Sequence, residues 1–401
     1  MKNNFTYDYT IVGGGIVGLS IAYKLQKKYP NLTICLLEKE KKLSFHQSGR
    51  NSGVIHSGLY YEPNSLRAKN CVNGRKQLVE FSKFHNLNFE ITGKIVVATN
   101  QDELSRVKGI YERGKLNGLN GIRIIDSHEI KEIEPHIQGI KGIWVPQSGI
   151  IDYSEVCDKF AELVKKINPK SSIITNSEVI SFSKGIECKI FTRNKSYLSK
   201  NLIFCGGLFS DRLAKKDNVN KNMRIVGFRG DYFKLNDSAK KKIRNLVYPI
   251  PNPKFPFLGV HFTRMVDGSV ECGPNAVFTF KREGYGKLDF NFKDTYDALS
   301  YQGTWKLFFK NWKFGLNEYR RAFSKKLFLK ELKKLCPKLK ISDLSPGRSG
   351  VRAIALLPNG EVFDDFKIIK NNRSIHILNA PSPAATSCLS IADHVINLIE
   401  N

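Results

Sequence analysis

A glycine-rich turn near the N-terminus constrains the fold of this chain more than any other feature. Gly13, Gly15 and Gly18 form the pattern G-x-G-x-x-G between the β-branched and aromatic run Tyr7 to Val12 and the apolar-periodic segment Ile16 to Lys28. The first glycine of such a pattern permits a tight turn, the second lets the backbone approach a pyrophosphate, and the third lets the helix pack on the strand. The segment therefore predicts a strand, turn and helix that bind the phosphates of a dinucleotide.

An acidic residue supports this prediction. Glu38 follows a second apolar run, Thr33 to Leu37, at the distance from the glycines where a carboxylate accepts hydrogen bonds from ribose hydroxyls. Because a carboxylate there repels a 2′-phosphate, the site disfavours NADP. The strand, helix and second strand form a βαβ unit and predict a parallel sheet. Their neighbours Ile16, Val17 and Lys39 are included among the predicted nucleotide contacts.

Composition narrows the class of protein. With 401 residues, of which 41% are hydrophobic, the chain is long enough for more than one domain with its own core. Its eight cysteines are scattered and form no C-x-x-C pair, so the sequence predicts no metal site and no disulfide framework. We interpret them as reduced thiols of a cytoplasmic protein. The sequence shows neither a secretory signal pattern nor an apolar run of the roughly 18 residues that span a bilayer.

The formal net charge of +27 suits nucleic acid, an anionic membrane surface or an anionic substrate. Lysines occur in nearly every segment, and no nucleic-acid-binding motif is present. We therefore favour a general compositional bias over a dedicated polyanion site and predict no nucleic-acid partner. Peripheral contact with an anionic membrane stays open.

The pattern of elements predicts an α/β fold with two domains. The βαβ unit continues in expected helices at Ser65–His85, Ile150–Lys166 and Ala384–Glu400 and expected strands at Ile173–Ser181, Leu202–Cys205 and Ser374–Asn379. These segments predict a discontinuous Rossmann-type domain with a parallel sheet, at residues 1–79, 150–218 and 345–401. Residues 80–149 and 219–344 instead show short strand-like runs, at Glu90–Thr99, Gly121–Trp144 and Arg224–Val277, and a charged helical region, Tyr319–Leu339. They predict a substrate-binding domain with a mixed or antiparallel sheet, an α+β arrangement.

Four segments carry a resemblance to a known family. They are SFHQSGRNSGVIHSGLYY at Ser44–Tyr61, FLGVHFTRMVDGSVECGPNAV at Phe257–Val277, SGVRAIAL at Ser349–Leu356 and NAPSPAATSCLSIADHV at Asn379–Val395. With them the chain resembles the D-amino-acid-oxidase-like flavoproteins, and within these the L-2-hydroxyglutarate oxidases and dehydrogenases. The resemblance implies that the dinucleotide is FAD and that the Rossmann-type domain is an FAD-binding domain. It also implies oxidation of L-2-hydroxyglutarate to 2-oxoglutarate, with electrons passed to oxygen, a quinone or another carrier.

The same resemblance assigns further cofactor contacts. In the loop that follows the βαβ unit, Ser48, Asn51, Ser52 and Gly53 are expected at the pyrophosphate and flavin, and Val179, Gly206 and Gly207 at the adenosine half. Ser382, Pro383, Ala384, Ala385 and Thr386 lie between an expected strand and an expected helix. Backbone N–H groups and a helix dipole there would face the flavin pyrimidine edge, where negative charge develops on reduction. The alternative is an ordinary helix start that contains proline.

Three residues are the catalytic candidates. His56 and His261 can each accept the proton of a substrate hydroxyl, since a neutral imidazole is a suitable base, and each can instead be a structural histidine. Arg352 follows a predicted turn, Pro346–Gly350, and its guanidinium can grip a carboxylate with two hydrogen bonds, unless it is a surface arginine of a basic protein. Tyr60, Tyr61 and Arg264 are weaker candidates for a second carboxylate.

Two alternatives remain beside the hydroxy acid. A flavoenzyme of this kind could oxidise an amine, an amino acid or glycerol 3-phosphate, although the strings GVHFTR and GPNAV favour the hydroxy acid. The fold could also serve as a non-catalytic flavin- or polyanion-binding module. The presence of His56, His261 and Arg352 argues against that second alternative.

Overall fold

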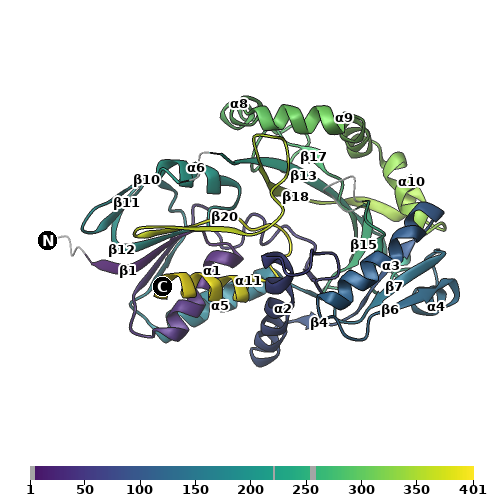
Figure 1. The fold of residues 1–401 in the computed structure, drawn as a ribbon, viewed down its shortest axis with the longest axis horizontal. Helices are drawn as coiled ribbons and strands as arrows, with labels where there is room; N and C mark the ends of the chain where they lie inside the picture. The colour runs from purple at the N-terminus through teal and green to yellow at the C-terminus, as the bar shows by residue number, and fades with distance from the viewer. Residues whose placement is uncertain (1–4, 220–221, 253–258) are drawn as a thin grey trace.

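Two large β-sheets dominate the structure, which is a computed structural model (Figure 1). It describes residues 5–219, 222–252 and 259–401, so Phe257 and Leu258 of one resemblance segment lie outside the described residues. The sheet that contains the first and the last strand of the chain lies on the left of Figure 1, and the second sheet lies on the right.

The first sheet contains the predicted βαβ unit. β1 (Thr6–Val12), α1 (Ile16–Lys28) and β2 (Ile34–Leu37) follow one another, and β1 and β2 pair in parallel. All four residues of β2 are buried, as expected for a parallel strand covered on both faces. The strand order is β10-β11-β12-β1-β2-β9, with β20 on β12 and β19 on β20. The remaining strands are β9 (Ser172–Ile174), β10 (Val179–Lys184), β11 (Cys188–Thr192), β12 (Ser196–Phe204), β19 (Lys367–Asn371) and β20 (Ser374–Asn379). The α/β prediction is confirmed.

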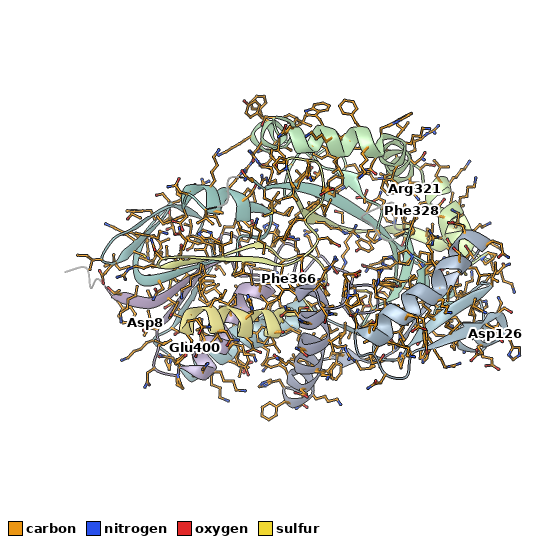
Figure 2. The ribbon with its side chains drawn as sticks, in the orientation of Figure 1. Asp8, Asp126, Arg321, Phe328, Phe366 and Glu400 are labelled. Atoms are coloured by element: carbon orange, nitrogen blue, oxygen red, sulfur yellow. The ribbon has the colours of Figure 1, made fainter. Side chains whose placement is uncertain are left out.

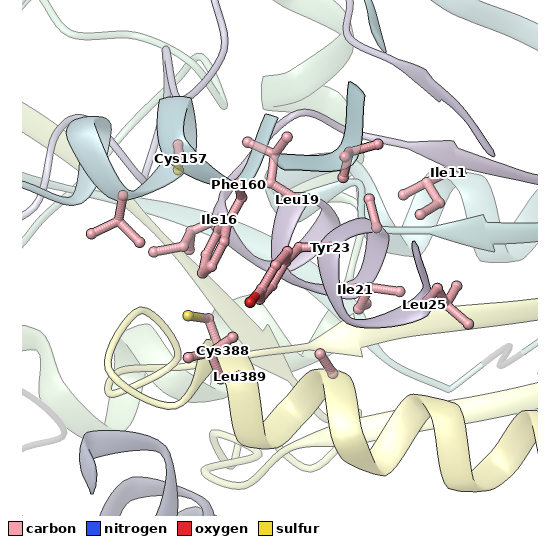
Figure 3. Packing of buried hydrophobic residues seen from close by; sticks show 14 of the residues in the cluster. Ile11, Ile16, Leu19, Ile21, Tyr23, Leu25, Cys157, Phe160, Cys388 and Leu389 are labelled. Atoms are coloured by element: carbon pink, nitrogen blue, oxygen red, sulfur yellow. The ribbon is translucent and has the colours of Figure 1, made fainter. Parts of the chain in front are cut away.

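Helices from distant parts of the chain form the core beside this sheet. α1 packs against α5 (Tyr153–Ile167) and α11 (Cys388–Glu400), as Figure 3 shows. The Tyr23 ring of α1 stacks on Phe160 of α5 with centroids 5.3 Å apart, and Leu389 of α11 is buried in the same cluster. Burial of each such side chain contributes about 1.5–3 kcal/mol. α2 (Leu66–Phe84) packs on α11, while the 3₁₀ turn η1 (Gly207–Phe209) and α6 (Ser210–Lys216) pack at β20.

The second sheet joins strands of both predicted inserts. Its order is β17-β13-β16-β15-β14-β5-β7-β6, with β18 on β13, and β14–β5 is its parallel pair among antiparallel ones. The strands are β5 (Lys94–Ala98), β6 (Arg123–Asp126), β7 (Lys141–Val145), β13 (Arg224–Leu235), β14 (Leu246–Pro249), β15 (His261–Arg264), β16 (Val270–Gly273), β17 (Val277–Phe278) and β18 (Leu344–Leu356). The predicted mixed sheet is confirmed.

Helices surround the second sheet. α10 (Lys325–Leu335) buries Phe328 and Leu332 in a core with β-strand residues; Phe328 is labelled in Figure 2. α8 (Phe292–Leu299) and α9 (Gln302–Phe323) lie along the upper edge of the molecule in Figure 1. The others are α3 (Gln101–Leu116), α4 (Ser127–Ile133), α7 (Asp237–Lys240) and η2 (Ile341–Asp343). A small sheet of β3 (Val54–Ile55), β8 (Gly149–Ile151) and β4 (Phe89–Glu90) connects the two halves.

The predicted turn Pro346–Gly350 was wrong. These residues lie inside β18, which pairs with β13 over nearly its whole length. Pro346 lacks an N–H donor, but it lies opposite Phe233 beside a shift in strand register, a position that tolerates proline. Arg352 is consequently in the middle of a strand, and this strand belongs to the second sheet although residues from 345 onward were assigned to the FAD-binding domain.

Several predicted helix limits were also wrong. Ile150 lies in β8 and α5 begins only at Tyr153, while the last helix begins at Cys388 rather than Ala384. The predicted helical region Tyr319–Leu339 is the end of α9 followed by α10, divided at Ser324, whose hydroxyl accepts a hydrogen bond from Leu327 N. The expected strand Ile173–Ser181 is split into β9 and β10. Local patterns located these elements, but pairing partners and caps set their ends.

Candidate active site

A cavity of about 1350 Å³ lies between the two sheets. It exceeds the roughly 300–1,000 Å³ of ordinary small-ligand pockets and therefore has room for a dinucleotide together with a small substrate. Most of the predicted site residues line it: Gly13, Gly15, Ile16, Val17, Gly18, Glu38, Lys39, Ser48, Asn51, Ser52, His56, Tyr60, Tyr61, Val179, Gly206, Gly207, His261, Arg352, Ser382, Pro383, Ala384 and Ala385. Gly53, Thr386 and Arg264 are not among the lining residues.

The three glycines of the N-terminal turn have distinct geometries. A Cβ atom on Gly13 would lie 2.3 Å from the Cys205 carbonyl oxygen, and one on Gly18 would lie 2.1 Å from the Gly13 carbonyl oxygen. Gly13 also has φ +117°, which side-chain-bearing residues rarely adopt. A Cβ on Gly15 would approach only the Ser48 hydroxyl, at 3.1 Å. Gly13 and Gly18 are thus required by the protein itself, whereas Gly15 leaves its backbone open to the cavity.

Glu38 is buried and fixed by the backbone. Its carboxylate accepts hydrogen bonds from Gly14 N at 2.7 Å and from Glu40 N at 2.9 Å. It thereby lies against the glycine turn at the end of β2, where a ribose is expected. The adjacent Lys39 ammonium pairs with Glu283 and lies 4.4 Å from the Phe209 ring centroid. The donors and acceptors at this end of the cavity fit the adenosine half of a dinucleotide.

The polar loop after β2 is held together by its own side chains. Asn51 Nδ2 donates to the carbonyl oxygens of Gln47 and Ser48, and Asn51 Oδ1 accepts from Gly53 N at 2.8 Å. Ser48 Oγ accepts from Ile16 N at the start of α1. Asn51 and Gly53 therefore shape the loop, while Ser48 joins it to the glycine turn.

Thr386 joins the C-terminal segment to the loop that carries His56. Its buried hydroxyl accepts a hydrogen bond from His56 N at 3.1 Å and lies 2.8 Å from the Tyr153 hydroxyl. The segment before it, Ser382–Ala385, faces the cavity, and α11 begins without a side-chain cap. The positive end of a helix favours negative charge, which agrees with the expected flavin pyrimidine edge.

His261 has a defined proton arrangement. It is buried on β15 and stacks on Tyr248 with centroids 3.9 Å apart. Its Nδ1 lies 2.9 Å from the Gly259 carbonyl oxygen, which can only accept, so Nδ1 carries the proton and Nε2 keeps its lone pair. Burial lowers the pKa of His261 to about 3, and Arg352 and Lys94 contribute further positive charge. The imidazole is therefore neutral near pH 7.

His56 lies near enough to His261 for a positive charge on His261 to lower the pKa of His56. Burial lowers the pKa of His56 to about 3, with further lowering by Lys94, Arg67 and His261. Its Nε2 lies 3.5 Å from the Ser382 hydroxyl. The structure thus brings both predicted histidines to one end of the cavity, although their roles stay predictions.

Arg352 lies beside these histidines. It lines the cavity from the middle of β18 and forms a hydrogen bond with the Tyr232 hydroxyl, a residue the sequence did not single out. Tyr60 and Tyr61 line the same end, and burial raises the pKa of both phenols, so both remain protonated donors at neutral pH.

Arg264 does not reach the cavity. Its guanidinium forms two hydrogen bonds with the Glu90 carboxylate, at 3.0 and 2.8 Å. Arg264 lies three residues after His261 on a strand, where successive side chains point to opposite faces. That alternation, read from the sequence, would have separated Arg264 from His261.

Lys94 and Arg67 were not predicted as site residues from the sequence. Lys94 is 1% exposed, and its ammonium lies 4.6 Å from the Tyr60 ring centroid and 5.1 Å from that of Tyr248. Burial lowers its pKa to about 8, and no Asp or Glu within the described ranges forms an ion pair with it. Arg67 Nε donates to the Ser382 carbonyl oxygen at 2.6 Å and its guanidinium lies over Tyr61. In the sequence, Lys94 directly precedes the apolar run Ile95–Ala98, and this position could have indicated a buried lysine.

Other features carry no separate site. Glu40, His46 and Glu283 form a cluster of possible metal ligands, but they already pair with one another and with Lys39. All eight cysteines lie in the described part of the chain and are free. Among the described helices, none has the length and apolar character needed to cross a membrane.

Comparisons with known proteins agree with this geometry. The family model described as FAD dependent oxidoreductase matches residues 8–398. L-2-hydroxyglutarate dehydrogenase of Indibacter alkaliphilus is 46% identical over 97% of this chain and 98% of its own length. The enzyme of the same name from Escherichia coli K12 is 41% identical over 98% of this chain and 93% of its own.

Solved structures share the fold. L-α-glycerophosphate oxidase from Mycoplasma pneumoniae with FAD bound superposes with a TM-score of 0.80 at 23% identity, over 99% of this chain and 95% of its own. Glycine oxidase from Geobacillus kaustophilus has a TM-score of 0.73 at 13% identity, over 98% and 95%. The protein binds FAD and belongs to the FAD-dependent oxidoreductases, within the group of relatives named L-2-hydroxyglutarate dehydrogenases.

Proposed function

We propose that this oxidoreductase converts L-2-hydroxyglutarate to 2-oxoglutarate. The observation that carries the proposal is the convergence of His56, His261 and Arg352 at one end of the cavity, beside the buried ammonium of Lys94. A dicarboxylic hydroxy acid needs a base for its hydroxyl proton and positive charge for two carboxylates. This end of the site offers both.

The chain's own groups would bind the substrate and move one proton. Arg352 can hold the carboxylate next to the reacting carbon with two hydrogen bonds. We propose His261 Nε2 as the atom that accepts the hydroxyl proton, because Nδ1 already donates to the Gly259 carbonyl oxygen. When bound, FAD supplies the acceptor for the hydride that leaves the same carbon. His56 is the second candidate for the base.

Lys94 is proposed as the charge that favours the distal carboxylate. A buried ammonium without a carboxylate partner among the described residues attracts an anion more strongly than an exposed one does. Lys94 is not among the residues that line the cavity, but its ammonium lies 4.6 Å from the ring centroid of Tyr60 and 5.1 Å from that of Tyr248, and both tyrosines line it. Arg352 and Lys94, which lie on different strands, would therefore each attract one of the two carboxylates of the substrate.

Anaerobic flavin bleaching tests the proposed function. The FAD-loaded protein should be reduced rapidly by L-2-hydroxyglutarate and much more slowly by D-2-hydroxyglutarate, L-2-hydroxybutyrate, glycerol 3-phosphate or amino acids. Equal rates with L-2-hydroxybutyrate, which lacks the distal carboxylate, would refute the substrate assignment. Bleaching by an amino acid or by glycerol 3-phosphate alone would establish the alternative.

The finer parts of the biology are also proposals. We propose a cytoplasmic protein that passes electrons to oxygen, a quinone or another carrier, and that contacts anionic membranes peripherally; the net charge of +27 supports that contact. We also propose the division into an FAD-binding and a substrate-binding domain. The two large sheets support that division, with the first sheet in the FAD-binding domain and the second in the substrate-binding domain. Because β18 belongs to the second sheet, it is assigned to the substrate-binding domain.

A further inference from the structure

The outer surface of α8 and α9 carries a row of exposed aromatic side chains. α9 is kinked at Asn311. Trp305 and Phe309 before the kink are four residues apart, and Trp312, Leu316 and Phe323 after it are four and seven residues apart, so each set lies on one side of its own part of the helix. Each of these side chains is between 46% and 73% exposed. On α8, Phe292 and Tyr296 are four residues apart and 76% and 67% exposed. Figure 2 shows ring-bearing side chains pointing outward from this edge. We call these seven residues the α8–α9 face.

The charges around this face have one sign. Lys293, Lys306, Lys310, Lys313 and Arg320 are exposed. The acidic residues from 291 to 323 are Asp294, Asp297 and Glu318, and each is paired with arginine and at least half-buried. The face therefore combines apolar rings with uncompensated positive charge.

The exposure does not arise from a loosely attached helix. On the inner side of α9, the Tyr319 hydroxyl donates to the Phe278 carbonyl oxygen at 2.7 Å, and Glu318 accepts from Ala276 N at 2.8 Å. Leu307 and Ala322 are buried beneath the helix. Since α9 is anchored to β17, its outer rings are held in water, which costs free energy unless something covers them.

We propose that the α8–α9 face binds the surface of an anionic lipid bilayer, with its rings at the headgroup boundary and its lysines on the phosphates. Trp, Phe and Leu flanked by Lys are the composition of helices that lie in a membrane interface. A second copy of this chain would bring lysines against lysines without acidic partners, so self-association is disfavoured. Sequence-independent binding of RNA would need a groove, whereas these exposed side chains belong to two helices along the upper edge of the molecule (Figure 1).

The cavity opens next to this face. Lys293, Leu307, Lys310 and Asn311 of α8 and α9 line the same cavity as the catalytic candidates. A bilayer on the α8–α9 face would therefore lie beside the mouth of the site. The proposal does not depend on the substrate, because a protein that failed the bleaching test would still bind vesicles through this face.

Vesicle flotation of the FAD-loaded protein tests the proposal. Binding is expected to vesicles of phosphatidylcholine with one quarter phosphatidylglycerol, weakly to phosphatidylcholine alone, and less at high salt. The variant Phe309→Ser, Trp312→Ser, Leu316→Ser should bind at least about 100-fold more weakly, since three apolar side chains lose their burial. The control Phe84→Ser, Leu116→Ser, Ile186→Ser alters three apolar residues elsewhere that are even more exposed, and it should bind like the unaltered protein.

Tryptophan quenching locates the contact. Two of the three tryptophans of the chain, Trp305 and Trp312, are on the α8–α9 face. Brominated lipids should quench their fluorescence, and Trp305→Phe with Trp312→Phe should retain binding but lose most of the quenching. Equal loss of binding in the two serine variants would overturn the proposal. An absence of quenching would also overturn it. The same holds for an RNA oligonucleotide that displaces the vesicles, or for a dimer of the unaltered protein that is monomeric in the face variant.

Discussion

His261 differs from His56 in having a defined tautomer, with the proton on Nδ1 and the lone pair on Nε2. His261→Gln should retain FAD and lower kcat by about 10²–10⁴-fold, the usual loss when a general base is removed. His56→Gln should have a smaller effect on kcat, because no carbonyl oxygen of the described residues bonds its ring nitrogens as the Gly259 carbonyl oxygen bonds His261. Stopped-flow flavin reduction measures both variants, and a larger loss in His56→Gln would exchange the two roles.

The lowered histidine pKa values give a pH dependence with a defined direction. The base must be neutral, so activity falls only as pH drops through its pKa, which burial holds near 3 in the unliganded protein. The acid limb of kcat/KM, which reports the free enzyme, should therefore lie well below pH 6.5. The limb of kcat should lie higher, because a bound dianion favours the imidazolium. An acid limb of kcat/KM at or above pH 6.5 would contradict this expectation.

Arg352 and Lys94 should differ in which carboxylate they affect. Arg352→Met should lower kcat/KM by about 10- to 150-fold on every 2-hydroxy acid, the equivalent of about 1.5–3 kcal/mol for a charge-assisted hydrogen bond. Arg352→Lys should restore only part of the loss, since a point charge lacks the two-pronged geometry.

Lys94→Met should instead change selectivity. It should lower kcat/KM at least about 10-fold for L-2-hydroxyglutarate and little for L-2-hydroxybutyrate, because the lost charge acts on the distal carboxylate. The Tm should not fall, since an apolar side chain of similar size removes an uncompensated buried charge. Parallel losses on both acids would assign Lys94 a general structural role.

At the scale of elements, the glycine turn separates folding from cofactor binding. Gly15→Ala should leave the Tm of the FAD-free protein unchanged, because its Cβ meets only the Ser48 hydroxyl at 3.1 Å, yet it should weaken FAD binding by blocking backbone approach. Gly18→Ala should lower the Tm of the FAD-free protein, since its Cβ would lie 2.1 Å from the Gly13 carbonyl oxygen. Calorimetry and FAD titration measure both. A large Tm loss in Gly15→Ala would show that Gly15 is also required for packing.

At the scale of the whole molecule, buried neutral histidines make stability depend on pH. His56 and His261 have pKa values of about 3 in the folded state and near 6.5 when unfolded. Between these values the unfolded chain binds more protons, so stability falls as pH drops below 6.5 and is unaffected by these groups above it. The Tm of the FAD-free protein should therefore decline from pH 6.5 to 4.5. His261→Gln should flatten that decline, and an unchanged slope would show that other groups cause it.

Features that depend on local backbone requirements could be predicted from the amino-acid sequence. Gly13 and Gly18 leave no space for a side chain, and Glu38 follows a buried strand. These three residues lie in one short segment, so the βαβ unit and its phosphate-binding turn could be predicted. The loop around Asn51 is also local, because that side chain bonds residues within four positions.

Features that depend on contacts between distant segments of the chain could not be predicted before the fold was known. Strand pairing with β13 converted a predicted turn into part of β18, and an ion pair with Glu90 removed Arg264 from the substrate site. The position of Lys94 between Tyr60 and Tyr248, and the exposure of the rings on α9, follow from which elements pack together. Residue type and spacing state what a side chain can do, but burial, partners and charge environment arise only when segments far apart in the chain meet.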